Sequence, residues 1–316
     1  MNNEVFITGR EGFVGTWLSR ELKSHGYSVS GTSHRHYPEG EKDNIFHCDI
    51  TNAEQIGKLI SDRQPHFIVH LAALVKPADA IKNPALALKI NVDGTRNIFE
   101  SVRAVPGYHP RVIIIGSAEE FGVVPSDITI NEETSLLPVN PYGESKMLAW
   151  KLAEEYVRDY HLDIVSAIPF NHTGPGQALG FLAPDVAAQI VEIEKGFKEP
   201  ILVTGNISHK RNFSDVRDVA RAYRLLLESG RAGERYIVCA DKSVPLSYIV
   251  TTLIEMSSVK IEHQIDPNRA RIEDIADFTA SHAKITRETG WMPEIPLEQT
   301  LKDLLDWYRR KGKIEK

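Results

Sequence analysis

A short apolar strand that runs directly into a glycine loop is the feature that most limits how this chain can fold. Residues 4–8 are typical of a buried strand, residues 9–15 carry three glycines at three-residue spacing, and an apolar-periodic helix then extends to about His25. Glycines spaced in this way allow a tight turn, close approach of a pyrophosphate and close packing of the helix on a sheet. Because phosphate binds favourably at a helix N-terminus, the pattern predicts a dinucleotide site. The residues expected to form it are Gly9, Gly12, Phe13, Val14 and Gly15.

Strands and helices continue to alternate through the first half of the chain. Further strands are expected at 27–32, 45–48, 66–71 and 111–116, with helices near 53–62 and 84–104. Such alternation is typical of a doubly wound parallel α/β sheet of the Rossmann type, in which ligands bind at the carboxyl ends of the strands. Cofactor contacts at two of these ends are expected from Asp49, Ile50, Leu71, Ala72 and Ala73.

The end of the second strand indicates which dinucleotide is bound. A site that prefers NAD usually offers a carboxylate to the ribose 2′-hydroxyl at this point. Here the strand is followed by Ser33, His34 and Arg35, and the first acidic residue is Glu39. A hydroxyl, an imidazole and a guanidinium suit a 2′-phosphate, so the sequence predicts NADP(H) as the cofactor. The alternative is a solvated basic turn.

A tyrosine and a lysine four residues apart begin a later helix. Asn140 is a good N-cap and Pro141 suits the first helical position, so Tyr142 and Lys146 should share one face. Unit charges about 5 Å apart interact by about 3 kcal/mol at an effective dielectric of ~20. We therefore expect Lys146 to lower the pKa of the Tyr142 phenol from about 10 toward neutrality, where it can exchange a proton with a carbonyl or alcohol. The alternative is an ordinary exposed helix start.

A small polar turn follows the strand at 111–116 and supplies a possible partner for that tyrosine. Ser117 stands at the carboxyl end of the strand, where its hydroxyl could bind a substrate oxygen beside Tyr142. Serines in loops are often only turn formers. A glycine loop, this serine and the tyrosine–lysine pair occurring in succession make the catalytic interpretation the stronger one.

Composition and cysteine content exclude several other classes. The net charge of −6 and the lack of a long basic run argue against nucleic-acid binding. Cys48 and Cys239 do not suggest a disulfide framework. His66 and His70 would be too far apart on a strand to chelate easily, so no metal is expected. No apolar run is long enough for a membrane span, no signal peptide is evident, and a cytoplasmic location is expected.

Together these motifs resemble the extended short-chain dehydrogenase/reductases over essentially the whole chain. The resemblance rests on the glycine loop, Leu71-Ala72-Ala73, the Asn-Val-Asp-Gly-Thr run at 91–95, Ser117, and Tyr142 with Lys146. Narrower motifs at 170–177, 211–219, 288–291 and 295–297 resemble the GDP-4-keto-6-deoxymannose reductases, and the sister GDP-mannose 4,6-dehydratases share parts of this set.

The resemblance implies roles for the matching residues. Tyr142 would donate the proton, Lys146 would bind the nicotinamide ribose and tune Tyr142, and Ser117 would polarise the C4 carbonyl. Contacts with the nucleotide sugar would come from Ser117, Glu119, Asn171, Arg211 and Arg271. The alternative for Arg211 and Arg271 is a position on the protein surface, in partial salt bridges.

The resemblance also implies two interleaved lobes and a partner chain. Residues 1–170 would form the NADP-binding Rossmann domain, with 212–240 returning to it. Residues 171–211 and 241–316 would form a smaller α/β lobe that binds the nucleotide sugar. The helices at 84–104 and 142–161 carry apolar residues widely around their circumference, and in this family such helices form the four-helix interface of a homodimer.

The activity expected from the resemblance is NADPH-dependent reduction of a GDP-linked 4-keto-6-deoxy sugar, with GDP-4-keto-6-deoxy-D-mannose giving GDP-D-rhamnose. The alternatives are a GDP-sugar 4,6-dehydratase, a 4-epimerase, or an idle cofactor-sensing protein on the same fold. Glu119 lies where related dehydratases keep a catalytic base, and here it is interpreted as an acceptor that orients the sugar. Ala118, Phe121 and Ile272 depart from the residues common in relatives.

Overall fold

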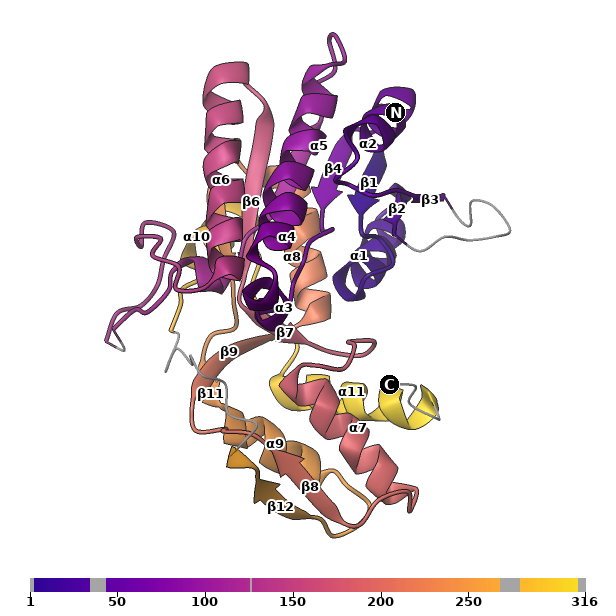
Figure 1. The fold of residues 1–316 in the computed structure, drawn as a ribbon, viewed down its shortest axis with the longest axis vertical. Coiled ribbons are helices and arrows are strands. Elements are labelled where there is room, and N and C mark those ends of the chain that lie inside the picture. Colours follow the sequence, from indigo (N-terminus) through magenta and orange to yellow (C-terminus); the bar gives the residue numbers. More distant parts are fainter. Residues whose placement is uncertain (1–2, 35–43, 126, 268–278, 312–316) are drawn as a thin grey trace.

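A computed structural model of the chain describes residues 3–34, 44–125, 127–267 and 279–311. A large sheet with helices on both faces occupies one part of the molecule, and a smaller lobe lies beyond the ends of its strands (Figure 1). The carboxyl ends of the strands point toward this lobe (Figure 1). The predicted doubly wound α/β architecture is confirmed.

The larger sheet contains seven strands in the order β10-β6-β5-β4-β1-β2-β3, and all the paired strands are parallel. Its strands are β1 (Glu4–Thr8), β2 (Ser28–Ser33), β3 (Ile45–His47), β4 (Phe67–His70), β5 (Arg111–Ile115), β6 (Asp163–Pro169) and β10 (Arg235–Val238). Every residue of β1 is buried, as expected for a central strand covered on both faces.

Two hydrophobic cores flank this sheet, because successive side chains of a strand point to opposite faces. Val5 and Ile7 pack into one core with the two helices on that face, and Phe6 packs into the other. The first face carries α1 (Phe13–Ser24) and α8 (Val216–Ser229), and the second carries α2 (Ala53–Arg63), α5 (Gly94–Arg103) and α6 (Pro141–Tyr160).

The long helix expected at 84–104 is interrupted in the structure. It divides into α4 (Pro84–Leu88), a π-helical turn η1 (Lys89–Asp93) and α5, and an unpredicted short helix α3 (Pro77–Lys82) precedes them. The Asn83 side chain accepts a hydrogen bond from the backbone of Leu86 and so begins α4. The π turn buries the side chain of Asn91, which the functional site uses.

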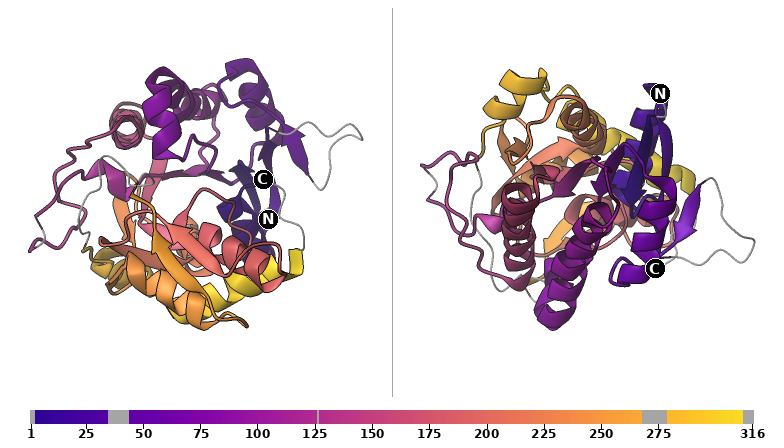
Figure 2. Two further views of the ribbon diagram at one scale, coloured as in Figure 1. Left: turned by 60° about the horizontal axis from the view of Figure 1, so that its bottom comes forward. Right: turned by 90° about the horizontal axis from the view of Figure 1, so that it is seen from above.

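In the described part of the smaller lobe, two small sheets and three helices surround a third core, and Figure 2 shows the lobe from two further directions. Its strands are β7 (Asn171–Thr173), β9 (Lys210–Asp215) and β11 (Ser243–Pro245) in one sheet, and β8 (Ile201–Thr204) and β12 (Glu262–Ile265) in the other. Its helices are α7 (Leu182–Glu194), α9 (Leu246–Glu255) and α11 (Leu297–Lys311).

The segment 241–316, which is expected to belong to the smaller lobe, also contributes side chains to a core of the larger sheet. Ile285, in the short helix α10 (Ala283–Thr289), and Trp291 are both fully buried in the core beside α8. Apolar side chains at these two positions therefore return part of the C-terminal segment to the larger sheet.

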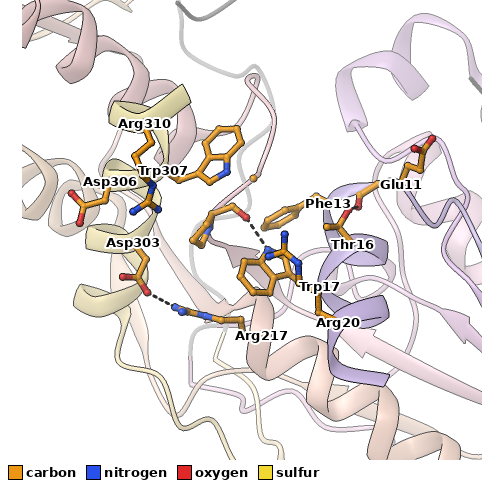
Figure 3. Close-up of a pocket in the computed structure, with 13 residues that line it drawn as sticks. Glu11, Phe13, Thr16, Trp17, Arg20, Arg217, Asp303, Asp306, Trp307 and Arg310 are labelled. Atoms are coloured by element: carbon orange, nitrogen blue, oxygen red, sulfur yellow. Dashed lines mark hydrogen bonds and ion pairs between the residues drawn. The ribbon is translucent and has the colours of Figure 1, made fainter. Parts of the chain in front are cut away.

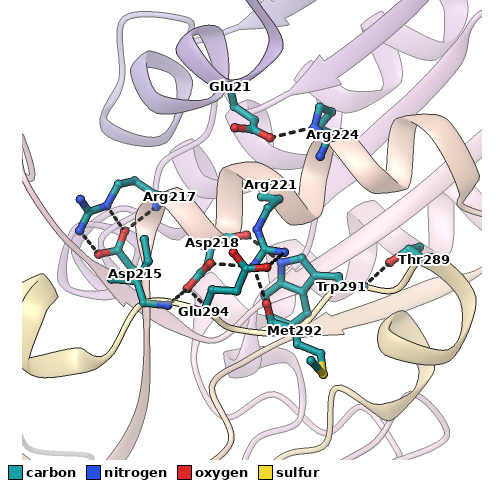
Figure 4. A network of polar contacts seen from close by, with 11 residues as sticks. Glu21, Asp215, Arg217, Asp218, Arg221, Arg224, Thr289, Trp291, Met292 and Glu294 are labelled. Carbon is teal, nitrogen blue, oxygen red and sulfur yellow. Dashed lines mark hydrogen bonds and ion pairs between the residues drawn. The ribbon is translucent and has the colours of Figure 1, made fainter. Parts of the chain in front are cut away.

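A buried carboxylate ties this returning segment to α8 (Figure 4). Asp218 Oδ2 accepts hydrogen bonds from the backbone N–H groups of Glu294 at 3.0 Å and Ile295 at 2.9 Å. The Trp291 indole N–H donates to the backbone oxygen of Asp218 at 2.9 Å, and Arg221 pairs with the carboxylate at 2.8 Å. Two motifs that lie more than seventy positions apart in the sequence thus meet at one side chain.

Candidate active site

Ser117, Tyr142 and Lys146 come together at the carboxyl ends of the central strands. Ser117 follows β5 and caps the short 3-10 helix η2 (Ala118–Glu120), where its Oγ accepts the N–H of Glu119 at 3.2 Å. Tyr142 lies in the first turn of α6, near enough to the Ser117 hydroxyl for that group to act on the pKa of its phenol. Lys146 lies one turn further along the same helix and is 8% exposed.

Local sequence explains why the helix begins at this point and packs on the serine turn. Asn140 Oδ1 accepts the N–H of Gly143 at 2.9 Å, and Pro141 occupies the first helical position, as predicted. A Cβ at Gly143 would lie 2.3 Å from the backbone oxygen of Glu119, so only glycine allows this close approach. The Asn140 side-chain amide donates to Glu119 Oε2 at 2.8 Å, which orients that carboxylate.

Electrostatics at the tyrosine differ from the sequence-based expectation. Burial raises the pKa of Tyr142, Glu119 and Glu120 raise it further, and the hydrogen bond with Ser117 opposes them. The prediction that Lys146 lowers this pKa is therefore wrong here, because burial of the phenol and two nearby carboxylates dominate. Tyr142 consequently stays protonated near neutral pH and can act as a proton donor.

The pKa of Lys146 is also shifted by its surroundings. Its ammonium group donates to the backbone oxygen of Ile115 at 3.0 Å. Burial lowers the pKa of Lys146 to about 8, with the Glu120 carboxylate acting in the opposite direction. Lys146 is therefore charged at neutral pH and loses its proton in mildly alkaline solution.

Asn91 supports the site and was not identified from the sequence. From η1 its side-chain oxygen accepts the N–H of Leu74 at 2.8 Å, and its amide donates to the Leu74 carbonyl at 3.2 Å and to Ser145 Oγ at 2.8 Å. It thus joins the segment after β4 to α6 beside the catalytic pair. The Asn-Val-Asp-Gly-Thr run was part of the family resemblance, but its spacing gave no indication of a π turn.

The glycine loop has the shape needed for a cofactor pyrophosphate. Gly9 has φ +68°, and a Cβ there would lie 3.1 Å from the backbone nitrogen of Ala72. A Cβ at Gly15 would lie 2.6 Å from the backbone oxygen of Arg10. Gly12 caps α1 without a side-chain hydrogen bond, so the first backbone N–H groups of the helix are left to a ligand. This loop therefore fits the phosphates of a dinucleotide.

Other residues expected to bind the cofactor lie at the carboxyl ends of the neighbouring strands β1 and β4. His70 Nδ1 and Thr8 Oγ1 are hydrogen-bonded at 2.8 Å, and the hydroxyl also accepts the N–H of Ala72 at 3.1 Å, which fixes Leu71–Ala73 beside the loop. Burial, with Lys146 adding to it, lowers the pKa of His70 to about 3, so this histidine is neutral. Within the described ranges, no group of His, Cys, Asp and Glu could hold a metal ion.

The adenosine end is only partly described. Ser33 is buried at the end of β2 and His34 is exposed, while Arg35 lies outside the described residues. Asp49 accepts the backbone N–H of Thr51 at 2.9 Å, and Ile50 is buried.

Two of the residues expected to contact the nucleotide sugar, Asn171 and Arg211, lie on adjacent strands of the smaller lobe. Asn171 on β7 is exposed and pairs in register with Phe213 of β9, the strand that carries Arg211. Arg211 is partly buried and donates to the backbone oxygen of Lys210 at 2.8 Å. Arg271 lies outside the described residues.

A cavity of about 540 Å³ adjoins the glycine loop between α1 and α11 (Figure 3). Trp17 on one wall donates its indole N–H to the Pro175 carbonyl at 2.8 Å, and Arg217 pairs with Asp303 of α11 at 2.7 Å. Gly12 and Phe13 line the cavity, whereas the serine, tyrosine and lysine described above do not. The cavity therefore borders the glycine loop and not the Ser117, Tyr142 and Lys146 cluster.

A Rossmann sheet, a glycine loop and a serine–tyrosine–lysine set define the extended short-chain dehydrogenase/reductases. The family model described as GDP-mannose 4,6 dehydratase matches residues 6–304, and the chain belongs to this family. It is an oxidoreductase-type enzyme of nucleotide-sugar metabolism.

Individual relatives agree with this assignment. The chain is 32% identical over 314 residues to the GDP-6-deoxy-D-mannose reductase of Pseudomonas aeruginosa, covering 98% of this chain and 99% of that protein. The structure of RMD from Pseudomonas aeruginosa complexed with NADPH matches with a TM-score of 0.87 at 30% identity, over 98% of this chain and 99% of that one. The GDP-mannose 4,6-dehydratase of Yersinia enterocolitica is 22% identical over 347 residues, covering 96% of this chain and 92% of that protein.

Proposed function

We propose that the chain is an NADPH-dependent reductase that converts GDP-4-keto-6-deoxy-D-mannose to GDP-D-rhamnose. The observation that carries the proposal is the placement of Tyr142 beside the Ser117 turn and one helical turn from Lys146, with a phenol whose pKa is raised by burial. Reduction of a ketone needs a proton donor at the oxygen, and a protonated phenol supplies one. The full-length similarity to a GDP-6-deoxy-D-mannose reductase supports the substrate class.

In this mechanism the bound cofactor would supply the hydride, and side chains of the protein bind and protonate the ketone oxygen. The Ser117 hydroxyl donates a hydrogen bond to that oxygen, and a fixed donor of this kind is worth about 3–4 kcal/mol in the transition state. Tyr142 delivers its proton to the same oxygen. Lys146 presents a positive charge to the phenolate that remains and binds the nicotinamide ribose.

NADPH would be held by the glycine loop and by the adjacent strand ends. The start of α1, which has no side-chain cap, would bind the pyrophosphate, and Ala72 of Leu71–Ala73 lies close to Gly9 of the loop. Asp49 and Ile50 would contact the adenine end. Ser33, His34 and Arg35 would bind the 2′-phosphate.

The nucleotide part of the substrate would lie against the smaller lobe. Asn171, Arg211 and Arg271 are proposed to bind the diphosphate or nucleoside, because guanidinium groups match phosphate oxygens with two parallel hydrogen bonds. Binding energy gained at this remote end orients the sugar at Tyr142.

Glu119 is proposed to orient the sugar rather than to remove a proton from it. Its carboxylate is held by Asn140, and the preceding residue, Ala118, is buried and cannot supply an acid for a departing hydroxyl group. A dehydratase would need both a base such as Glu119 and an acid for the departing hydroxyl group. The presence of Glu119 beside Tyr142 nevertheless makes 4,6-dehydration the alternative activity.

We further propose a cytoplasmic homodimer. Leu86 and Leu88 of α4 are each 39% exposed, Ile81 of α3 is 56% exposed and Tyr160 of α6 is 47% exposed, which is unusual for large apolar side chains on neighbouring helices. Packing α4–α5 and α6 against the same helices of a second copy would cover them. Within the described residues, no helix is long and apolar enough to cross a bilayer.

A test with two substrates separates reduction from dehydration. With GDP-4-keto-6-deoxy-D-mannose, we expect one NADPH oxidised per sugar and an NMR spectrum of GDP-D-rhamnose. With GDP-mannose alone, we expect no product. Formation of a 4-keto sugar from GDP-mannose without added NADPH, seen as its absorbance in alkali, would show a dehydratase instead.

A further inference from the structure

A carboxylate beneath the catalytic serine has no place in the mechanism described so far. Glu120 is 0% exposed, and its Oε1 accepts the backbone N–H of Ser117 at 2.7 Å. Together with the Ser117 Oγ contact this forms a capping box, a motif normally found at exposed helix starts. A Cβ at Gly116 would lie 2.5 Å from Glu120 Oε1, so glycine at that position leaves room for the buried carboxylate.

An arginine from a distant strand neutralises this carboxylate. Arg235 begins β10, and its Nη2 donates to Glu120 Oε2. The guanidinium carbon lies 5.7 Å from the ring centre of Phe121 and 5.4 Å from that of Trp150. Trp150 lies on α6, about two turns beyond Tyr142. The ion pair therefore connects the serine turn with the helix that carries the tyrosine.

Stability alone does not account for such a pair. Burial raises the pKa of Glu120 and lowers the pKa of Arg235, so burial disfavours the charged form of each partner. The buried Nε of Arg235 also has no hydrogen-bond partner among the described residues. Replacing a buried ion pair with apolar side chains of similar volume is often neutral or stabilising.

We propose that Glu120 and Arg235 are a positioning pair, which holds the Ser117 backbone and thereby aligns the serine hydroxyl with Tyr142. The inference rests on the proposed function only in taking Ser117 and Tyr142 as the groups that act on the ketone. Neither Glu120 nor Arg235 needs to touch the substrate.

The charge of Glu120 also acts on the two groups that carry protons. Lys146 faces Glu120 from η2 and His70 from β4, and the carboxylate opposes the lowering of the Lys146 pKa by burial. Removing that negative charge lowers the pKa of Lys146 below about 8, so the ammonium loses its proton at a lower pH.

Tyr142 faces the same carboxylate. The groups around it are Ser117, Glu119 and Glu120 of the turn and Tyr223 of α8, and both carboxylates raise its pKa. Loss of the charge at position 120 therefore favours the phenolate, which is the wrong form for a proton donor.

The test uses Glu120→Gln, which keeps the shape and removes the charge, with Glu194→Gln as the matched control. Glu194 pairs with Arg309 at 2.6 Å in the smaller lobe, where its side chain is 10% exposed. At pH 6, which lies well below the Lys146 pKa of about 8 in the unmodified protein, we expect Glu120→Gln to lower kcat roughly ten-fold or more and to change the Kd for NADPH less than about two-fold. Glu194→Gln should keep the kcat of the unmodified protein.

A second measurement needs no turnover. NADPH affinity, followed by its fluorescence from pH 6 to pH 9.5, should decline above about pH 8 in the unmodified protein and in Glu194→Gln. The decline should begin at lower pH in Glu120→Gln. An unchanged kcat or an unchanged pH dependence would overturn the proposal.

Two further cases have their own tests: a variant that does not fold, and an unmodified protein without reductase activity. If Glu120→Gln does not fold, Glu120→Leu/Arg235→Leu replaces the pair with apolar side chains, and the full kcat in that variant would also overturn the proposal. If the unmodified protein binds NADPH but reduces no keto sugar, the proposed function fails. The NADPH titration alone then decides the role of Glu120.

Discussion

Replacing Asp218 by alanine should release the segment around residues 291–295 from α8. The Asp218 side chain is 2% exposed and accepts two backbone N–H groups and one guanidinium. A donor that loses its buried partner costs about 1–3 kcal/mol, and hydrogen bonds to charged groups are worth about 1.5–3 kcal/mol. We take about 1 kcal/mol, the low end, for each of the three interactions, because Glu294 and Arg221 are partly exposed. The free energy of unfolding should therefore fall by about 3 kcal/mol.

Urea unfolding followed by tryptophan fluorescence measures this loss, since Trp291 is fully buried in the same cluster. For a slope near 3 kcal/mol per molar urea, the midpoint should fall by about 1 M. Lys302→Ala is the control, because its pair with Asp306 is exposed and worth less than about 1 kcal/mol. A midpoint for Asp218→Ala within about 0.2 M of the control would refute the reasoning.

The remaining predictions concern the reaction. Tyr142→Phe should keep NADPH binding but lower kcat roughly 10²–10⁴-fold, and near-normal turnover would exclude the phenol as the proton donor. Arg211→Ala should raise KM for the nucleotide sugar about ten-fold with little change in its affinity for NADPH, whereas unchanged kinetics would return Arg211 to a surface role. Arg35→Ala should weaken NADPH binding about ten-fold and leave NADH binding nearly unchanged, and equal losses for both cofactors would contradict the 2′-phosphate assignment.

The parts of the site that follow from short-range patterns were predictable. The strand before the glycine loop, the helix that begins at Pro141 and the serine turn after β5 each depend on a few consecutive residues whose conformational preferences agree. Tyr142 and Lys146 share a helix face for the same reason.

What could not be predicted depends on contacts between distant positions or on burial. Glu120 and Arg235 are separated by 115 positions, so no spacing relates them. The pKa of Tyr142 was predicted with the wrong sign, because the sequence shows that a lysine is near but not that desolvation of the phenol and two nearby carboxylates raise its pKa. Ile285 and Trp291 similarly join the larger core because of packing that composition does not show.

The π turn of Lys89–Asp93 has a consequence for which deletions this chain can tolerate. A π turn holds one residue more than the α-helical turn it replaces. Deleting one residue within Lys89–Asp93 would therefore restore a continuous helix and remove the wide turn on which Asn91 lies. Asn91 would then no longer reach Leu74 and Ser145, and α6 would lose this hydrogen bond without any substitution in it. At this point of the chain, length is under the same functional constraint as residue identity.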